Sequence, residues 1–383
     1  MADAPLCLLL LTRPLESFIL HDQAVDLLRA PGVVAIEPPR VPYGALLRLP
    51  EPLADRVAAA QARRLTRGLA AHGRPKVVVM FHAVQYRLAR ALLAGQPDGE
   101  LWYSRWDRYE EAYDASPKQR AQLAELHVRA AERSAYTFAV STELVRLEEE
   151  AGRTAHLVPS AADAFPALDL GPAADHARDP NLVPSRTSRP PSGRDVRLGD
   201  EEGDGAAPVA ISLGHLGWRT DWALLRGTVD ALPALTLHLV GEWHEDESGD
   251  DPDFVALRTS PRVVWHGRLA DPEAAALILD ADVGLVPFTR TPFNDAGLPN
   301  RILKYARQGR RTVSPSLAGA RTWERAVTFA DGPAAFAEAI AAHAGARHAP
   351  DRELRDWALT QNARAQNAPL WERLETLEVD VRA

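Results

Sequence analysis

Cysteine is almost absent from this chain of 383 residues, in which Cys7 stands alone. A single thiol excludes an internal disulfide framework and a metal cluster held by several thiolates, and it favours the cytoplasm as the compartment. Features of a targeting segment are missing too, because the apolar run Leu6–Leu11 is short and no basic residue precedes it. Such a run predicts a first β-strand rather than a signal peptide or a membrane span.

Lysine is scarce as well, since only Lys76, Lys118 and Lys304 are lysines, and arginine supplies the remaining positive charge. The formal net charge is −8 at pH 7. Up to Leu168 the chain has 20 basic and 20 acidic residues, so the whole acidic excess lies beyond that point. An acidic chain is a poor binder of nucleic acid, and we expect no nucleic-acid partner.

Spacings typical of metal ligands are also missing. The acidic run Glu245–Asp253 resembles a metal-binding D-x-D motif, but it contains Gly and Pro and lies between two predicted strands. A solvated loop is the simpler interpretation of such a charge run. The sequence therefore predicts no metal site and no cofactor.

What the chain does contain is a regular alternation of short apolar runs and helical patterns. In the first half, the predicted strands are Leu6–Thr12, Val33–Pro39, Lys76–Phe81, Glu100–Trp106, Tyr136–Ser141 and His156–Ser160. The helical patterns between them cover His21–Ala30, Asp55–His72, Ala83–Leu93 and Pro117–Arg133. Strands that alternate with helices of this length predict an α/β fold, with a parallel sheet covered by helices on both faces.

The segment Asp169–Ala207 interrupts this alternation. It has five prolines, clustered charges and no aromatic residue, which is typical of a flexible linker or a surface insertion. Further strands are then predicted at Pro208–Gly214, Leu235–Gly241, Arg262–Gly267, Asp282–Phe288, Arg311–Ser314 and Ala326–Asp331. The end of the chain, Asp351–Leu377, has a helical pattern that is interrupted near Pro369. We expect two doubly wound Rossmann-like domains, 1–168 and 208–345, with ligands in the central cleft that faces the carboxyl ends of their strands.

The stretch Thr289–Ser316 contains the most informative pattern in the chain. It follows the apolar run Ala281–Phe288 and predicts a loop, a helix with Pro299 at its first position and Gly309 at its C-cap, and another strand. Free backbone N–H groups at the start of such a helix suit a phosphate, and Arg301 adds a rigid fork of donors. An ordinary helix-strand unit is the alternative interpretation.

A second glycine-containing loop lies between a predicted strand and helix. Gly214 and Gly217 bracket this loop, and Arg219 follows them. Glycines let backbone N–H groups approach phosphate oxygens closely, and Arg219 would add a second phosphate contact. The alternative is a simple strand-to-helix turn with a solvated arginine.

Several segments resemble the GT-B glycosyltransferases, especially the family-4-like bacterial group and its xanthan-type glucuronosyltransferase relatives. The glycine loop GHLGWRTDWALL resembles the loop that opens their donor domain, and LPNRILKYARQGRRTVSPS resembles their donor-site motif P-x-K-x-x-E-Y-x-x-x-G-x-x-V-x-x. In the first half, HDQAVDLL, YSRWDRY and HLVPSAAD resemble segments of their acceptor domain. The resemblance covers almost the whole chain apart from the 169–207 segment.

The resemblance implies that 1–168 is an acceptor-side domain, that 208–345 binds the donor nucleotide, and that the helical segment 346–383 crosses back to the first domain. It implies a metal-independent, hexosyltransferase-like enzyme. Such an enzyme would take a UDP- or GDP-linked sugar as substrate and transfer it to a glycan, lipid-linked or small-molecule acceptor. The donor-site motif places Arg301 at its basic position, with Pro299 just before it. Lys304 occupies the position of the usual donor-ribose glutamate, and Ala296 that of its earlier partner.

Asp107 is the candidate general base. It follows the predicted strand Glu100–Trp106, and Tyr103, Trp106 and Tyr109 are its aromatic neighbours in sequence. Partial burial among aromatic rings raises the pKa of a carboxyl group toward a useful range, and the resemblance places a base here. The alternative is a helix cap, where Asp is common. Three residues that follow strand ends are candidates on the acceptor side, namely His82, Ser141 and Glu143.

A set of arginines gives the acceptor half a basic amphipathic segment. Its members are Arg56, Arg63, Arg64, Arg67 and Arg74. One interpretation is peripheral contact with the inner face of the membrane, where a lipid-linked acceptor would lie; the other is a solvated helix face. The sequence does not indicate the oligomeric state.

Two other functions compete with sugar transfer. A GT-B protein that binds sugars or partners without catalysis is favoured by Lys304, by the missing glutamate pair and by the altered turn Pro159–Asp163, where relatives have P-N-G-x-D. A nucleotide-sugar epimerase would need acidic and histidine groups around the donor sugar, and the sequence reveals none. Fold alone does not decide among these functions.

Overall fold

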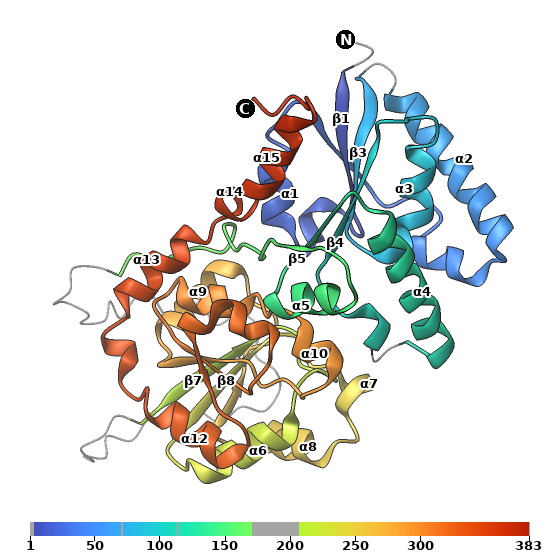
Figure 1. Ribbon diagram of the computed structural model, residues 1–383. Coiled ribbons are helices and arrows are strands. Elements are labelled where there is room, and N and C mark those ends of the chain that lie inside the picture. Colours follow the sequence, from blue (N-terminus) through green and yellow to red (C-terminus); the bar gives the residue numbers. More distant parts are fainter. Residues whose placement is uncertain (1–3, 70–71, 113–114, 171–206, 383) are drawn as a thin grey trace.

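The computed structural model describes residues 4–69, 72–112, 115–170 and 207–382, and it has two α/β units with a six-stranded sheet in each (Figure 1). Every pair of neighbouring strands in both sheets is parallel. The predicted fold class is therefore confirmed. Most of the predicted linker Asp169–Ala207 lies outside the described residues.

The first sheet has the strand order β2-β1-β3-β4-β5-β6. Its strands are β1 (Pro5–Leu10), β2 (Val33–Ile36), β3 (Arg74–Met80), β4 (Glu100–Arg105), β5 (Tyr136–Ala139) and β6 (His156–Leu157). The helices of this unit are α1 (His21–Leu27), α2 (Glu51–Leu69), α3 (Tyr86–Leu92), α4 (Pro117–Arg133) and α5 (Thr142–Glu150).

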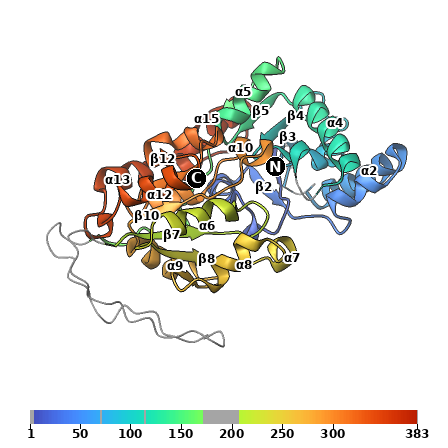
Figure 2. The same ribbon diagram turned by 90° about the horizontal axis from the view of Figure 1, so that it is seen from below.

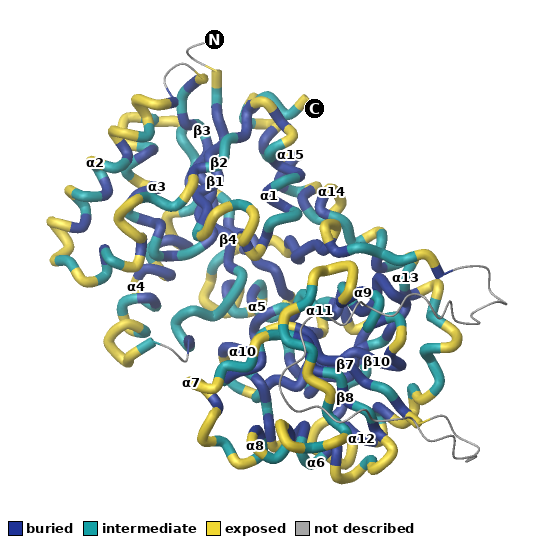
Figure 3. The backbone as a smooth tube through the Cα atoms, turned by 180° about the vertical axis from the view of Figure 1, so that it is seen from behind, coloured by how far each residue is buried: buried dark blue, intermediate teal, exposed yellow. Residues whose placement is uncertain are grey.

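The apolar run in β1 is continuous because helices cover both faces of the sheet. Leu6, Leu8 and Leu10 pack into a core with α2, α3 and α4. Cys7 and Leu9 point to the opposite face and pack with α1 and the C-terminal helix. This alternation follows the two-residue period of a strand, and Figure 3 shows inner strands such as β1 and β10 as largely buried.

The second sheet has the strand order β12-β11-β10-β7-β8-β9. Its strands are β7 (Val209–Leu213), β8 (Thr236–Val240), β9 (Val263–Trp265), β10 (Val283–Leu285), β11 (Thr312–Ser314) and β12 (Val327–Phe329). The helices are α6 (Trp222–Ala231), α7 (Glu245–Ser248), α8 (Pro252–Thr259), α9 (Asp271–Leu279), α10 (Pro292–Ala296), α11 (Arg301–Ala306) and α12 (Pro333–Ala341). One core joins α6, α8 and α12 to one face, and another joins α9 and α11 to the opposite face. Helices α6 and α12 lie side by side (Figure 2).

In both sheets the chain starts at an inner strand and later changes direction across the sheet. The change lies between β1 and β3 in the first sheet and between β7 and β10 in the second. Adjacent loops leave in opposite directions at such a switch point, which opens a crevice beyond the carboxyl ends of the strands. The ends of β7 and β10 are therefore where a ligand is expected.

The last part of the chain forms three helices rather than one interrupted helix: α13 (Arg352–Thr360), α14 (Ala363–Gln366) and α15 (Ala368–Thr376). One break is at Asn367, close to Pro369, which lies within the first turn of α15, where proline is tolerated. The other break was not expected. There the side chain of Asn362 caps α14 by accepting a hydrogen bond from the N–H of Ala365 at 2.9 Å.

These C-terminal helices connect the two units. Helix α13 packs on the second unit through Leu354 and Ala358, whereas α15 lies beside α1 in the first unit (Figure 1). The indole N–H of Trp371 and the side-chain amide of Asn367 each donate a hydrogen bond to Asp26 Oδ2 at 2.9 Å. Both units therefore depend on the end of the chain.

Replacing Trp371 by Ala is expected to lower the free energy of unfolding by about 3–5 kcal/mol, because the ring is 4% exposed and fills the core between α1 and α15. Chemical denaturation measures this change. Trp265→Ala is the control: that ring is 44% exposed, so the loss should be less than half as large. Equal losses in the two variants would contradict the docking of α15.

The basic segment of the acceptor half lies mainly on α2. Arg56, Arg63, Arg64 and Arg67 are exposed there, while the buried face is made of Ala54, Ala58, Ala62 and Leu69. Arg74 is not on this helix, because it begins β3 and donates a hydrogen bond to Gln96. In the described part of the chain, no helix combines the length and the apolar character needed to cross a membrane.

Candidate functional site

A pocket of about 610 Å³ lies between the two units, at the switch point of the second sheet. Leu213 and Gly214, at the end of β7, form part of its wall. The first unit contributes Trp106 and Asp107, which follow the end of β4. A pocket of this size is typical of small-ligand sites.

Two arginines converge on one aromatic ring in this pocket. The guanidinium of Arg301 lies 4.7 Å from the ring centre of Phe288, and that of Arg219 lies 4.8 Å from the same centre. Arg219 is held by Asn294, whose Oδ1 accepts a hydrogen bond from Nε at 2.9 Å. Arg301 donates a hydrogen bond to Ser212 Oγ at 3.3 Å. Both positive charges therefore have fixed positions on the pocket wall.

Among the described residues, neither guanidinium forms an ion pair with a carboxylate. Burial lowers the pKa of Arg301 to about 10, with Tyr305 opposing part of this shift and the nearby charge of Arg219 adding a smaller part to it. Arg301 still remains protonated at neutral pH. Two like charges held together, with Asp107 as the nearby acid, form a site that favours an anion with more than one negative charge.

Gly214 is essential to this arrangement. Its φ is +107°, which side chains rarely allow, and an added Cβ would lie 2.6 Å from Arg301 Nη2. The sequence suggested backbone contact with phosphate at Gly214, and the structure shows a further reason for the glycine, which is room for Arg301. Gly217 does not line the pocket; its missing side chain leaves room for Glu247 instead.

Asp107 faces this arginine pair from the first unit. A Cβ on Gly297 would lie 2.9 Å from Asp107 Oδ1 and 3.7 Å from Arg219 Nη2. The carboxylate of Asp107 and the guanidinium of Arg219 therefore both lie next to the backbone of Gly297. Burial raises the pKa of Asp107 to about 6, and the charge of Arg219 opposes part of that rise. Asp107 does not cap the next helical turn, since Arg108 is the residue that precedes Tyr109–Glu111.

The aromatic surroundings of Asp107 differ in part from the expected ones. Trp106 lines the pocket and its ring lies 5.5 Å from that of Tyr109. Tyr103 instead points into the core on the other side of the sheet, where its hydroxyl lies 3.2 Å from His127 Nδ1. The reason is the strand period, because Tyr103 and Trp106 are an odd number of positions apart and face opposite sides.

Three predicted acceptor-side residues do not line the pocket. His82 accepts a hydrogen bond from the N–H of Val84 at 3.1 Å, and burial lowers the pKa of His82 to about 4, so the ring is neutral at pH 7. Ser141 donates a hydrogen bond to the carbonyl oxygen of Ala296 at 2.6 Å, which links the two units. Glu143 pairs with Arg146 on the same helix.

The predicted donor-site helix is shorter than expected. Helix α11 begins at Arg301, so Pro299 lies before it rather than at its first position. The reason is a tight turn, in which the N–H of Ile302 bonds to the carbonyl oxygen of Pro299 at 3.0 Å. Pro299 and Lys304 both line the pocket, and Lys304 Nζ lies 3.7 Å from Asp271 Oδ1. Gly309 has φ +67°, as expected of a residue that ends a helix.

A short helix within the same stretch was not expected. Helix α10 occupies part of the predicted polar loop, because Thr291 caps it by accepting a hydrogen bond from the N–H of Asn294 and Pro292 occupies its first turn. This helix places Asn294 where it can hold Arg219.

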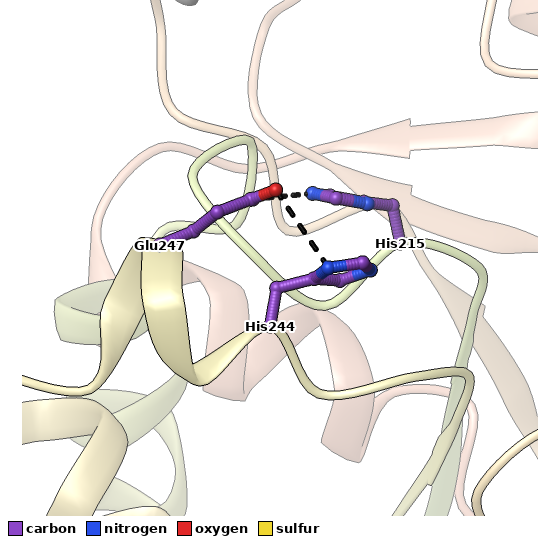
Figure 4. Close-up of side chains that lie close together, drawn as sticks. All are labelled: His215, His244 and Glu247. Atoms are coloured by element: carbon purple, nitrogen blue, oxygen red, sulfur yellow. Dashed lines mark hydrogen bonds and ion pairs between the residues drawn. The ribbon is translucent and has the colours of Figure 1, made fainter.

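Sequence reasoning missed a group of three polar side chains at one end of the pocket. His215 and His244 line the pocket, and the carboxylate of Glu247 lies beside both rings (Figure 4). The expected solvated loop Glu245–Asp253 is partly helical, since it contains α7 and the cap of α8, and Glu247 points inward. The i, i+3 spacing of His244 and Glu247 was a signal that could have been noticed, but His215 comes from a distant loop.

Comparisons with known proteins support the fold, although no protein-family model matches the chain. A stretch of 111 residues, 28% of the chain, is 27% identical to a protein of Bacillus subtilis strain 168 that is named as a teichuronic acid biosynthesis glycosyltransferase, TuaH. The matched region spans only 27% of that protein's length.

Three solved structures are similar over nearly the full chain, each at 13% identity. Sucrose-phosphate synthase from Thermosynechococcus elongatus has a TM-score of 0.68 over 98% of this chain and 99% of its own. HepE from Anabaena, in complex with UDP and glucose, has a TM-score of 0.64 over 97% and 100%. An α,α-trehalose 6-phosphate synthase from Burkholderia multivorans has a TM-score of 0.60 over 98% and 99%. At this identity the likeness shows the fold, which is the expected GT-B architecture.

Proposed function

We propose that this protein is a glycosyltransferase that binds a nucleotide sugar between its two units. The observation that carries the proposal is the pair of guanidiniums of Arg219 and Arg301 on the ring of Phe288. A diphosphate is the anion that matches two neighbouring positive charges in a pocket of this size. Developing negative charge on a departing nucleoside diphosphate would be stabilised by donors that are already in place.

Two comparisons support the same proposal. HepE, a structure with similar architecture, was solved with UDP and glucose, and the part of the chain that matches TuaH matches a protein named as a glycosyltransferase. We propose a UDP- or GDP-linked hexose as donor and a glycan, lipid-linked or small-molecule hydroxyl as acceptor. We also propose that the enzyme belongs to the family-4-like bacterial group and acts in the cytoplasm. If its acceptor is lipid-linked, the basic helix α2 would make peripheral contact with the membrane.

Asp107 is the proposed general base for an inverting transfer. The acceptor oxygen attacks the anomeric carbon of the donor, its proton passes to the Asp107 carboxylate, and the bond to the diphosphate breaks with its electron pair leaving on the diphosphate. A pKa of about 6 suits this role, because the carboxylate is deprotonated at pH 7 but is a stronger base than an exposed aspartate. Asp107 also lines the same pocket as the two arginines, so it lies beside the space proposed for the donor.

Binding of nucleoside diphosphates tests this proposal first. UDP or GDP at about 100 times its Kd should stabilise the folded protein by about 2.7 kcal/mol, measured as a rise in melting temperature. Uridine and guanosine are the controls, and each should bind at least ten times more weakly because it lacks the diphosphate. Equal affinities for the nucleoside and its diphosphate, or no binding of either, would reject the proposed function.

A sugar-binding GT-B protein without catalysis is the second candidate. It is favoured by the pocket position of Lys304, where related enzymes have a glutamate, and by the ion pair of Lys304 with Asp271 at 3.7 Å. Turnover of UDP- and GDP-sugars to free nucleoside diphosphate separates the two candidates. Tight diphosphate binding without turnover of any donor in the presence of acceptor extracts would favour the second.

A further inference from the structure

Two histidines and a glutamate gather at the end of the pocket that is formed by the loops after β7 and β8. His215 Nε2 lies 2.6 Å from Glu247 Oε2, and His244 Nδ1 lies 3.7 Å from Glu247 Oε1 (Figure 4). The two imidazole rings face each other with their centres 4.1 Å apart. The three side chains are 32%, 29% and 23% exposed, in chain order, so a small ligand can reach them.

The backbone holds these two loops together. Leu216 and Trp243 form an isolated parallel β-bridge, and each is the immediate neighbour of one of the histidines. The N–H of His244 also bonds to the carbonyl oxygen of Leu216 at 3.1 Å. Main-chain contacts therefore hold the two histidines close together in addition to their side-chain contacts.

Glu247 is oriented from two directions. Its Oε2 accepts a hydrogen bond from the N–H of Trp218 at 3.0 Å. A Cβ on Gly217 would lie 2.0 Å from that oxygen and 2.5 Å from His215 Nε2, so the glycine leaves the space in which these atoms meet. Such outer contacts around a ligating carboxylate are typical of metal sites.

We infer that His215, His244 and Glu247 form a binding site for a divalent transition metal ion of the zinc class. Two imidazole nitrogens and one carboxylate are a donor set that Zn²⁺ prefers, with the fourth position open to water or another ligand. The candidate ligand atoms all lie within 4.8 Å of one another. Ligands about 2.1 Å from a tetrahedral ion are roughly 3.4 Å apart, so modest side-chain rotations bring all three to one ion.

The open position would face the pocket, since both histidines line it. The inference differs from the sequence-based expectation of no metal, which rested on spacing along the chain. It does not depend on sugar transfer, because metal affinity can be measured without donor or acceptor.

Titration with Zn²⁺ and with Co²⁺ tests this site on the full-length, metal-free protein. Wild type should bind one equivalent of each ion, and bound Co²⁺ should give the intense visible absorption of a four-coordinate site. His215→Ala, His244→Ala and Glu247→Gln should each weaken binding by more than about 100-fold, since loss of even an outer partner typically costs 10- to 100-fold.

Two further variants complete the test. Gly217→Ala keeps all three ligands but should also weaken binding, because its Cβ occupies the space of the Glu247 carboxylate. His266→Gln is the matched control: His266 lies 2.8 Å from His238, a histidine pair outside the three-residue cluster, and it should bind Zn²⁺ like wild type. Circular dichroism confirms that each variant is folded.

The outcomes separate the metal site from a plain His–Glu ion pair. Stoichiometric binding that is lost in folded His244→Ala and Glu247→Gln, and kept in His266→Gln, supports the site. Absence of Zn²⁺ and Co²⁺ binding by wild type at micromolar concentrations, or equal binding by wild type and all variants, overturns it.

Discussion

Replacing Asp107 by Asn is expected to slow sugar transfer by about 100- to 10,000-fold, because the amide keeps the shape of the side chain but cannot accept the hydroxyl proton. The Kd for the nucleoside diphosphate should not rise, since Asp107 is itself acidic, lies near Arg219 and does not attract a phosphate. Transfer rate and diphosphate affinity measured on one preparation give both values. An Asn variant that is folded, binds donor and turns over at the wild-type rate would remove Asp107 from the mechanism.

The pH dependence of the transfer rate gives a second test of Asp107 as the general base. Burial raises the pKa of Asp107 to about 6, and only the deprotonated carboxylate can act as the base. Activity should therefore be full above about pH 7 and fall tenfold for each pH unit below 6. The residual activity of Asp107→Asn should lack this acid limb. An acid limb that remains in the variant would assign the titration to another group.

The second large effect is expected at the arginine pair. Arg301→Ala and Arg219→Ala should each weaken UDP or GDP binding by roughly 10- to 100-fold, since a hydrogen bond to a charged group contributes about 1.5–3 kcal/mol. Uridine or guanosine binding should hardly change, because neither nucleoside has a phosphate. The double variant should lose more than about 100-fold. Calorimetric titration of the four proteins with the nucleoside and its diphosphate measures all these affinities.

Arg268→Ala is the matched control for this series. Arg268 also lines the pocket, but its side chain is 83% exposed and its guanidinium is 4.0 Å from Glu242. Because solvent screens an exposed charge, its loss should change diphosphate affinity only a few-fold. If Arg268→Ala weakens binding as much as Arg301→Ala does, the pocket attracts anions through its general field and not through the pair on Phe288.

The sequence predicted a helix accurately where its cap, its first-turn residues and its apolar spacing were all present. Helix α4 has the predicted bounds Pro117–Arg133. A serine cap precedes it, proline occupies its first turn, and Gln119 completes a capping box, so its start depends only on neighbouring residues. The β1 run likewise predicts a strand covered on both faces. Since each unit repeats this alternation, the order of elements was enough to predict two parallel sheets, and the motif resemblance added the GT-B architecture.

Part of the candidate site was also visible along the chain. Arg219 and Asp107 lie in loops after strand ends, where parallel α/β sheets place ligands, whereas Arg301 was selected at the start of a predicted helix and at the basic position of the donor-site motif. The sequence also singled out His82 and Glu143 because they follow strand ends, yet neither lines the pocket and both have contacts of their own. The position after a strand end selects the edge of the sheet, but it does not select the direction of the side chain.

Only the tertiary structure decided which of these side chains meet. The two arginines share the ring of Phe288 because the loops after β7 and β10 leave neighbouring strands. Glu247 reaches His215 because a β-bridge joins two loops and Gly217 leaves the space between them. Such contacts depend on strand order and on the absence of a side chain at one position, and neither has a periodic signature. The sequence by itself therefore determined the fold and the edge of each sheet at which a ligand is expected. Packing between distant loops decided which charged and metal-ligating side chains lie together at that edge.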